Sequence, residues 1–153
     1  MRIKRVVKES FAVIGKEGST AEGDGFIQKL WNEANLQFEQ VKHLAKKDDA
    51  GNLVGIWGAM SDFTRSFLPW EDFNKGLYLA GIECVDGAIA PEGWTKWTIP
   101  GYVYLCSECD SDHAFSDTLN DMKEQGLCLV GAVHDFTCPQ TGKQYLFFPI
   151  RKL

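Results

Sequence analysis

The sequence predicts an α+β protein with antiparallel sheets and two helices, built from a βαββ module that occurs twice. The first observation is a repeat: Leu53–Phe63 and Leu129–Phe136 both begin Leu-Val-Gly, continue through an apolar run and end Asp-Phe. The second is an aromatic strand after each copy, Tyr78–Ile82 and Tyr145–Ile150. The third is a helix-like segment and an earlier β-like run before each copy. We therefore expect two pseudo-twofold halves with a ligand cleft at their seam; chance similarity of two short apolar strands is the alternative.

Length and composition predict one domain over residues 1–153, with halves at about 2–85 and 94–152. Apolar content of 44% and charged content of 24% are typical of a soluble globular protein. A net charge of −5, with no basic cluster larger than pairs such as 46–47 and 151–152, argues against direct nucleic-acid binding. No apolar run is long enough to span a membrane, and the N-terminus lacks a signal-peptide core. Five cysteines without disulfide spacing favour reduced thiols and a cytoplasmic location.

In the first half, β-forming residues predict a strand over 2–15, ending near Gly15 and Gly18. Apolar residues spaced by three or four then predict a helix over Phe26–Ala45, for which Asp24 is the expected N-cap. The next strand, Val54–Met60, contains two glycines, which indicate a bulge or a close approach to the backbone.

The segment Ser61–Gly76 is predicted to be a loop, although it carries Phe63, Phe67, Trp70 and Phe73. Surface loops rarely contain so many aromatic residues, so we expect these to form a pocket wall or lid. A strong strand, Leu77–Cys84, follows.

The second half begins after a turn-rich connection over 86–93. A β-run over Trp94–Tyr104 is expected to bend at Pro100-Gly101. Ser111 or Asp112 is the expected cap of a second helix, which Gly126 ends. Strands over Cys128–Thr137 and Gln144–Arg151 complete the chain, joined by a turn over 138–142.

Catalytic, metal and phosphate sites are weakly supported. The signatures Gly-x-Ser-x-Gly and His-Glu-x-x-His are both absent, and so is a phosphate-binding Gly-Lys-Ser/Thr loop. Cys138 and His134 are a conceivable thiol–imidazole pair, but the predicted strands would bring such residues near each other by chance. Cys106-x-x-Cys109 with His113 resembles half a zinc site, but a second ligand pair is missing. We therefore expect no metal and no cofactor.

An aromatic site with a carboxylate is better supported. The sequence offers many flat faces, which attract organic cations through the ring quadrupole. Glu83 shares a strand face with Leu77, Leu79 and Gly81. If that face is buried, Glu83 needs a partner, and a cationic ligand is the candidate. The alternative is that Glu83 lies at a strand end, in water or paired with a lysine.

Several segments together resemble the GyrI-like small-molecule-binding family, also called the bacterial transcription-activator effector-binding domain. They are Tyr78–Glu83, the turn 90–93 before Trp94–Gly101, and the ending from Tyr145 to Pro149-Ile150. The resemblance covers roughly residues 2–152. It implies a duplicated βαββ fold with the ligand between the copies. Family members occur behind helix-turn-helix segments or alone, and we expect the stand-alone form here.

The resemblance also implies a buried glutamate in the penultimate strand that meets cationic drugs. The alignment places His134 at that position, followed by Asp135 and Phe136. Asp135 or Glu83 would then have to replace the usual carboxylate, or the ligand need not be cationic.

The expected function is binding of hydrophobic or aromatic small molecules, cationic ones among them, for sensing or sequestration. One alternative is a hydrolase of reactive electrophilic natural products in the same cleft, with Glu83 and His134 as catalytic candidates and Glu71 as a further acid–base group. Another is modulation of a protein partner through a surface. The expected ligand-binding residues are Trp57, Phe63, Trp70, Phe73, Tyr78, Glu83, Trp94, Trp97, His134, Phe136 and Tyr145.

Overall fold

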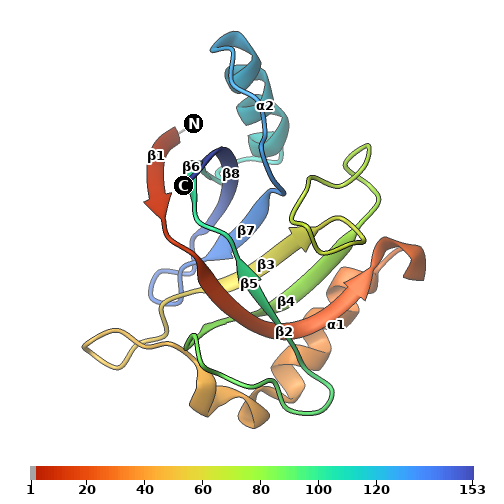
Figure 1. Cartoon of the computed structure of the whole chain (residues 1–153), viewed down its shortest axis with the longest axis vertical. Coiled ribbons are helices and arrows are strands. Elements are labelled where there is room, and N and C mark those ends of the chain that lie inside the picture. Colours follow the sequence, from red (N-terminus) through yellow and green to blue (C-terminus); the bar gives the residue numbers. More distant parts are fainter. Residues whose placement is uncertain (1–2) are drawn as a thin grey trace.

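A computed structural model describes residues 3–153 and has eight strands and two α-helices (Figure 1). In chain order the elements are β1 (Ile3–Lys8), β2 (Phe11–Ser19), α1 (Phe26–Leu36), β3 (Ile56–Ser61), β4 (Leu77–Cys84), β5 (Thr95–Ile99), β6 (Tyr102–Glu108), α2 (Ala114–Glu124), β7 (His134–Thr137) and β8 (Gln144–Lys152). Short 3₁₀ turns lie at Thr20–Glu22, Phe38–Gln40 and Lys42–Leu44.

The strands form one antiparallel sheet in the order β1-β6-β8-β7-β3-β4-β2-β5. This order reads the same from either end when β1 is exchanged with β5, β2 with β6, β3 with β7 and β4 with β8. The two halves join at the central pair, β3 with β7, and also through β1 with β6 and β2 with β5. The α+β class and the repeated arrangement predicted from the sequence are therefore confirmed.

Each half opens with one long bent ribbon rather than a simple strand. β1 continues into β2 after Glu9-Ser10, and β5 continues into β6 after Pro100-Gly101. The two ribbons pair with each other on both sides of the bends, Lys8 opposite Tyr102 and Phe11 opposite Ile99. The predicted bend at Pro100-Gly101 is confirmed. The strand predicted over 2–15 is instead two strands reaching Ser19, and its first residue lies outside the described part.

The first predicted helix is too long. α1 ends at Leu36, and the apolar residues beyond it lie in or beside 3₁₀ turns. A 3₁₀ turn has three residues per turn, so it produces a similar apolar spacing. Asp24 is not its cap, because Gly25 takes the N-cap position with a φ of 81°.

Two predictions for the second half also need correction. The N-cap of α2 is His113, and the Ser111 hydroxyl accepts the His113 N–H just before the helix rather than capping it. Gly126, with a φ of 72°, follows the helix end as expected. The strand predicted over 128–137 is regular only from His134, because the N–H groups of Val130 and Ala132 bond to Pro149 and Phe67 instead of a ladder.

The sheet has two differently covered faces. α1 and α2 lie on one face, which we call the helix face, and Figure 1 shows them at opposite ends of the molecule. The other, the inner face, is enclosed by the bent ribbons and carries a cluster that includes Trp57, Tyr104 and Phe147. Because side chains alternate along a strand, every central strand contributes to both faces.

Two glycines allow β2 and β4 to approach closely. Gly15 lies opposite Gly81, and a Cβ on Gly81 would stand 2.0 Å from the Ile14 carbonyl oxygen. A Cβ on Gly15 would stand 2.3 Å from the Ala80 oxygen. Backbone atoms cannot rotate away as a side chain can, so any side chain at these positions separates the strands.

We therefore expect Gly81→Ala to lower the free energy of unfolding by about 3 kcal/mol or more. Chemical denaturation measures this loss. Gly87→Ala is the matched control, because a Cβ at Gly87 meets nothing within 4 Å. Equal stability of the two variants would contradict the close approach.

Candidate ligand-binding cleft

A cavity of about 580 Å³ lies on the helix face, between α1 and the central strands. This size is within the range of pockets that hold drug-sized ligands. α1 supplies Ile27, Gln28, Trp31 and Asn35; the sheet and its connections supply Ile56, Tyr78, Cys109, Asp135, Phe136, Thr137, Gln144 and Leu146. We call this cavity the helix-side cleft.

A chain of polar side chains crosses the cleft. The Tyr78 hydroxyl donates to Asp135 Oδ2 at 2.9 Å, and the Trp31 indole N–H donates to the Tyr78 oxygen at 3.1 Å. Gly58 makes room for this contact, because a Cβ there would lie 1.9 Å from the Tyr78 oxygen and 2.3 Å from Asp135 Oδ2. The close approach that the sequence predicted for the glycines of this strand is therefore present.

Among the described residues that line the cleft, Asp135 is the only carboxylate, and none is Lys, Arg or His. Burial raises the pKa of Asp135 to about 6, although hydrogen bonds from Tyr78 and the Gly58 backbone lower it in part. Burial, with Asp135 as a second cause, also raises the pKa of Cys109. The cleft therefore presents an incompletely compensated negative charge among apolar and neutral polar side chains.

α1 builds its side of the cleft by helical periodicity. Ile27, Trp31 and Asn35 are four residues apart and share one face of the helix. Leu30 and Ala34, one step around the helix, are buried against the sheet. A smaller apolar cavity of about 150 Å³ under α1 shares Trp31 and includes the predicted site residue Trp94.

The predicted carboxylate Glu83 lies on the opposite, inner face. It is only 4% exposed, and its carboxylate contacts Lys8 Nζ at 3.2 Å and accepts the Trp57 indole N–H at 3.1 Å. The Lys8 ammonium also lies 4.3 Å from the centre of the Phe11 ring. Of the two partners that the sequence left open for Glu83, the structure shows the lysine.

His134 also lies on the inner face and is fully buried. Its Nδ1 accepts the Met60 N–H at 3.0 Å, while Nε2 has no hydrogen-bond partner. Burial lowers its pKa to about 3, so the imidazole is neutral at pH 7. Alternation along β7 places Asp135, not His134, in the helix-side cleft.

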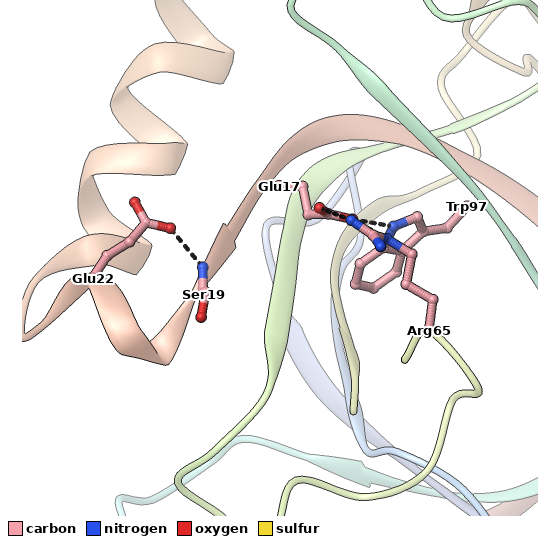
Figure 2. Close-up of polar contacts among 5 residues, drawn as sticks. All are labelled: Glu17, Ser19, Glu22, Arg65 and Trp97. Atoms are coloured by element: carbon pink, nitrogen blue, oxygen red, sulfur yellow. Dashed lines mark hydrogen bonds and ion pairs between the residues drawn. The ribbon is translucent and has the colours of Figure 1, made fainter. Parts of the chain in front are cut away.

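The loop between β3 and β4 covers parts of both faces. Phe67 packs edge-on against Trp97 on the inner face, and Phe73 packs edge-on against Phe115 of α2. Arg65 and the Trp97 indole N–H both donate to the carboxylate of Glu17 (Figure 2). The loop is therefore anchored to β2, which carries Glu17, by a charge-assisted contact.

Backbone conformation shows that the loop is held by these contacts. Arg65, Phe67, Asp72 and Phe73 all have φ between 52° and 60°. The left-handed region costs a non-glycine residue about 1–2 kcal/mol, so such residues persist only where the surroundings impose them.

The structure distributes the predicted site residues over several places. Tyr78 and Phe136 line the helix-side cleft. The inner face carries Trp57, Glu83, Trp97, His134, Phe136 and Tyr145. Trp94 lies under α1, Trp70 and Phe73 line a small cavity of about 130 Å³ beside α2, and Phe63 is 50% exposed. Trp31 was missed, although its spacing from Ile27 on the predicted helix was an available signal.

A metal site is not formed by the residues that the sequence suggested. Cys106 is buried on the inner face, whereas Cys109 lines the helix-side cleft. Within residues 3–153, no three His, Cys, Asp or Glu side chains are grouped so that they could hold a metal ion. No helix in this range has the length and apolar character required to cross a membrane.

The fold is shared with several solved structures of low sequence identity. Solved structures that share the fold include SAV2435 bound to tetraphenylphosphonium, with a TM-score of 0.63 and 14% identity over 99% of this chain and 94% of that one. The EcmrR C-terminal domain has a TM-score of 0.65 and 13% identity, over 99% of this chain and 98% of that one. An integron cassette protein from Vibrio cholerae has a TM-score of 0.55 and 15% identity, over 97% of this chain and 95% of that one.

Neither a protein-family model nor a curated protein sequence matches the chain. At these identities the structural likeness establishes the fold. The resemblance to GyrI-like domains seen in the sequence is thus confirmed at that level.

The raised pKa of Asp135 has a consequence for stability. A half-buried aspartate whose pKa is about 6 when folded and near its usual value when unfolded destabilises the fold when it is ionised. This cost is absent below about pH 4 and complete above about pH 6. We expect Asp135→Asn to raise the free energy of unfolding by about 1–2 kcal/mol at pH 8 and to change it little at pH 4. Denaturation at both pH values measures the difference. A destabilised variant at pH 8 would show that the charge is fully compensated.

Proposed function

We propose that this protein binds small hydrophobic or aromatic organic cations in the helix-side cleft, for sensing or sequestration. The observation that carries the proposal is Asp135, a carboxylate recessed in a cleft whose described lining residues include no basic side chain. A negative charge partly withdrawn from water without a cation is costly, and a cationic ligand removes that cost.

The walls suit the apolar part of such a ligand. Trp31 offers an aromatic face beside the carboxylate, and Ile27, Ile56 and Leu146 supply aliphatic surface. Aromatic faces stabilise cations by about 0.5–2 kcal/mol, most strongly where water is excluded. The Tyr78 hydroxyl fixes the carboxylate in position, so little ordering is needed when a ligand binds.

The binding of tetraphenylphosphonium by SAV2435, which shares the fold, supports the same ligand class. The hydrolase alternative gains no comparable support. Its candidates Glu83 and His134 lie outside the helix-side cleft, the first ion-paired with Lys8 and the second sealed in the core.

A lipophilic phosphonium dye tests the proposal through quenching of Trp31 fluorescence and calorimetry. We expect saturable binding that Asp135→Asn weakens at least about tenfold, or about 1.4 kcal/mol. Asp112→Asn, the same change at an exposed position, should leave affinity unaltered. Equal affinity in the Asp135 and Asp112 variants would exclude this carboxylate as the cation partner.

The pH dependence should follow Asp135. A permanent cation requires the ionised carboxylate, so affinity should fall below about pH 6, by about tenfold per pH unit. Tyr78→Phe removes a hydrogen bond that lowers the pKa of Asp135, so it should shift this midpoint upward. A profile that is flat from pH 4 to 8, or unmoved in Tyr78→Phe, would contradict the assignment.

A further inference from the structure

A second cavity, of about 340 Å³, lies on the inner face behind the helix-side cleft. Its lining residues are Val6, Val7, Lys8, Lys46, Val54, Trp57, Glu83, Phe136 and Phe147. We call it the inner cavity. Nothing in the proposed function uses it, because the helix-side cleft is formed by the other face of the same strands.

The charge of the inner cavity is opposite to that of the helix-side cleft. Two lysines line it, and Glu83 is the only acidic residue among its described lining residues. The carboxylate is committed to Lys8 at 3.2 Å, while Lys46 lies 3.9 Å away and its side chain is 50% exposed. One ammonium is therefore left largely uncompensated at the mouth of an apolar cavity, in a chain whose net charge is −5.

The positive groups are held in place before any ligand arrives. Lys8 is fixed by Glu83 and by the Phe11 ring. The backbone of Lys46 is fixed from both sides, because its N–H donates to the Glu83 carbonyl at 2.9 Å and its carbonyl accepts the Val54 N–H at 3.2 Å. Such preorganisation reduces the ordering cost of binding.

We propose that the inner cavity binds a small amphipathic organic anion, a carboxylate or sulfonate on an apolar body. The acidic group lies between Lys8 and Lys46. The apolar body lies against Val54, Trp57 and the Phe136 ring, where a charged or polar body would be left without hydrogen-bond partners.

Naphthalene-1-carboxylate is a suitable probe, and naphthalene-1-carboxamide is its neutral counterpart. The indole N–H of Trp57 reports on the site, because it bonds to Glu83 inside the cavity. Its signal in a ¹H–¹⁵N correlation spectrum is assigned by its loss in Trp57→Phe. We expect saturable shifts with the carboxylate at up to about 1 mM and binding at least about tenfold weaker for the amide. No saturable shift of the Trp57 signal, or equal binding of the amide, overturns the proposal.

Variants test the sign of the charge. Lys46→Met should weaken binding at least about tenfold, whereas Lys47→Met, at an exposed neighbour outside the lining, should not. Glu83→Gln should strengthen anion binding, since it removes the competing carboxylate while its amide oxygen still accepts the Trp57 N–H. Weaker binding in Glu83→Gln, or equal losses in the two lysine variants, overturns the proposal.

The Asp135→Asn variant separates this proposal from the function proposed for the helix-side cleft. It should bind the naphthalene anion as well as the native protein does, because Asp135 points to the other face. Stronger anion binding in Asp135→Asn would show that the probe occupies the helix-side cleft, where the native carboxylate repels it, and a loss of binding would show that the probe depends on Asp135; either result overturns the inner site. Failure of the phosphonium dye to bind would leave the inner site standing.

Discussion

The pairing of β3 with β7 is the contact on which the rest of the molecule depends. It joins the two halves through only three residue pairs, from Ile56 opposite Thr137 to Gly58 opposite Asp135. Because side chains alternate, this short ladder decides which groups face each cavity. A slip of β7 by one residue would exchange Asp135 with Phe136 and place the carboxylate in the aromatic core. A slip of β3 by one residue would instead exchange Ile56 with Trp57 and place the indole against α1.

Hydrophobic burial makes that register the stable one. Trp57 packs within 5.1 Å, centre to centre, of the rings of Phe11, Phe136 and Phe147. Burial of a side chain of this size contributes several kcal/mol, more than a carboxylate with one phenol donor costs. Packing of the aromatic core on the inner face therefore fixes the register of β3 with β7. That register in turn places the Asp135 carboxylate in the cleft on the helix face.

The sequence was informative where a pattern is local. The repeat of Leu-Val-Gly and Asp-Phe predicted the duplicated architecture, and alternation on β4 correctly grouped Glu83 with Leu77 and Leu79. The sequence could not show that Lys8, 75 residues away, supplies the partner of Glu83, since that contact depends on how the first ribbon bends. It also could not decide between His134 and Asp135, because a one-residue choice of face is set by pairing across strands. The loop aromatics were expected together at one pocket, yet the left-handed residues turn Phe67 and Phe73 toward different parts of the fold.

Among the residues that the structure describes, Phe136 is the only one common to the linings of both cavities. The two proposed sites thus lie on opposite faces of one sheet and share one aromatic ring. Thermodynamic linkage requires that any free energy by which an occupant of one site displaces that ring be returned, with the same magnitude, as a change in affinity at the other. On the two proposals, a sheet that is one layer thick serves as a two-sided receptor, in which binding of an anion on one face and of a cation on the other are coupled through Phe136.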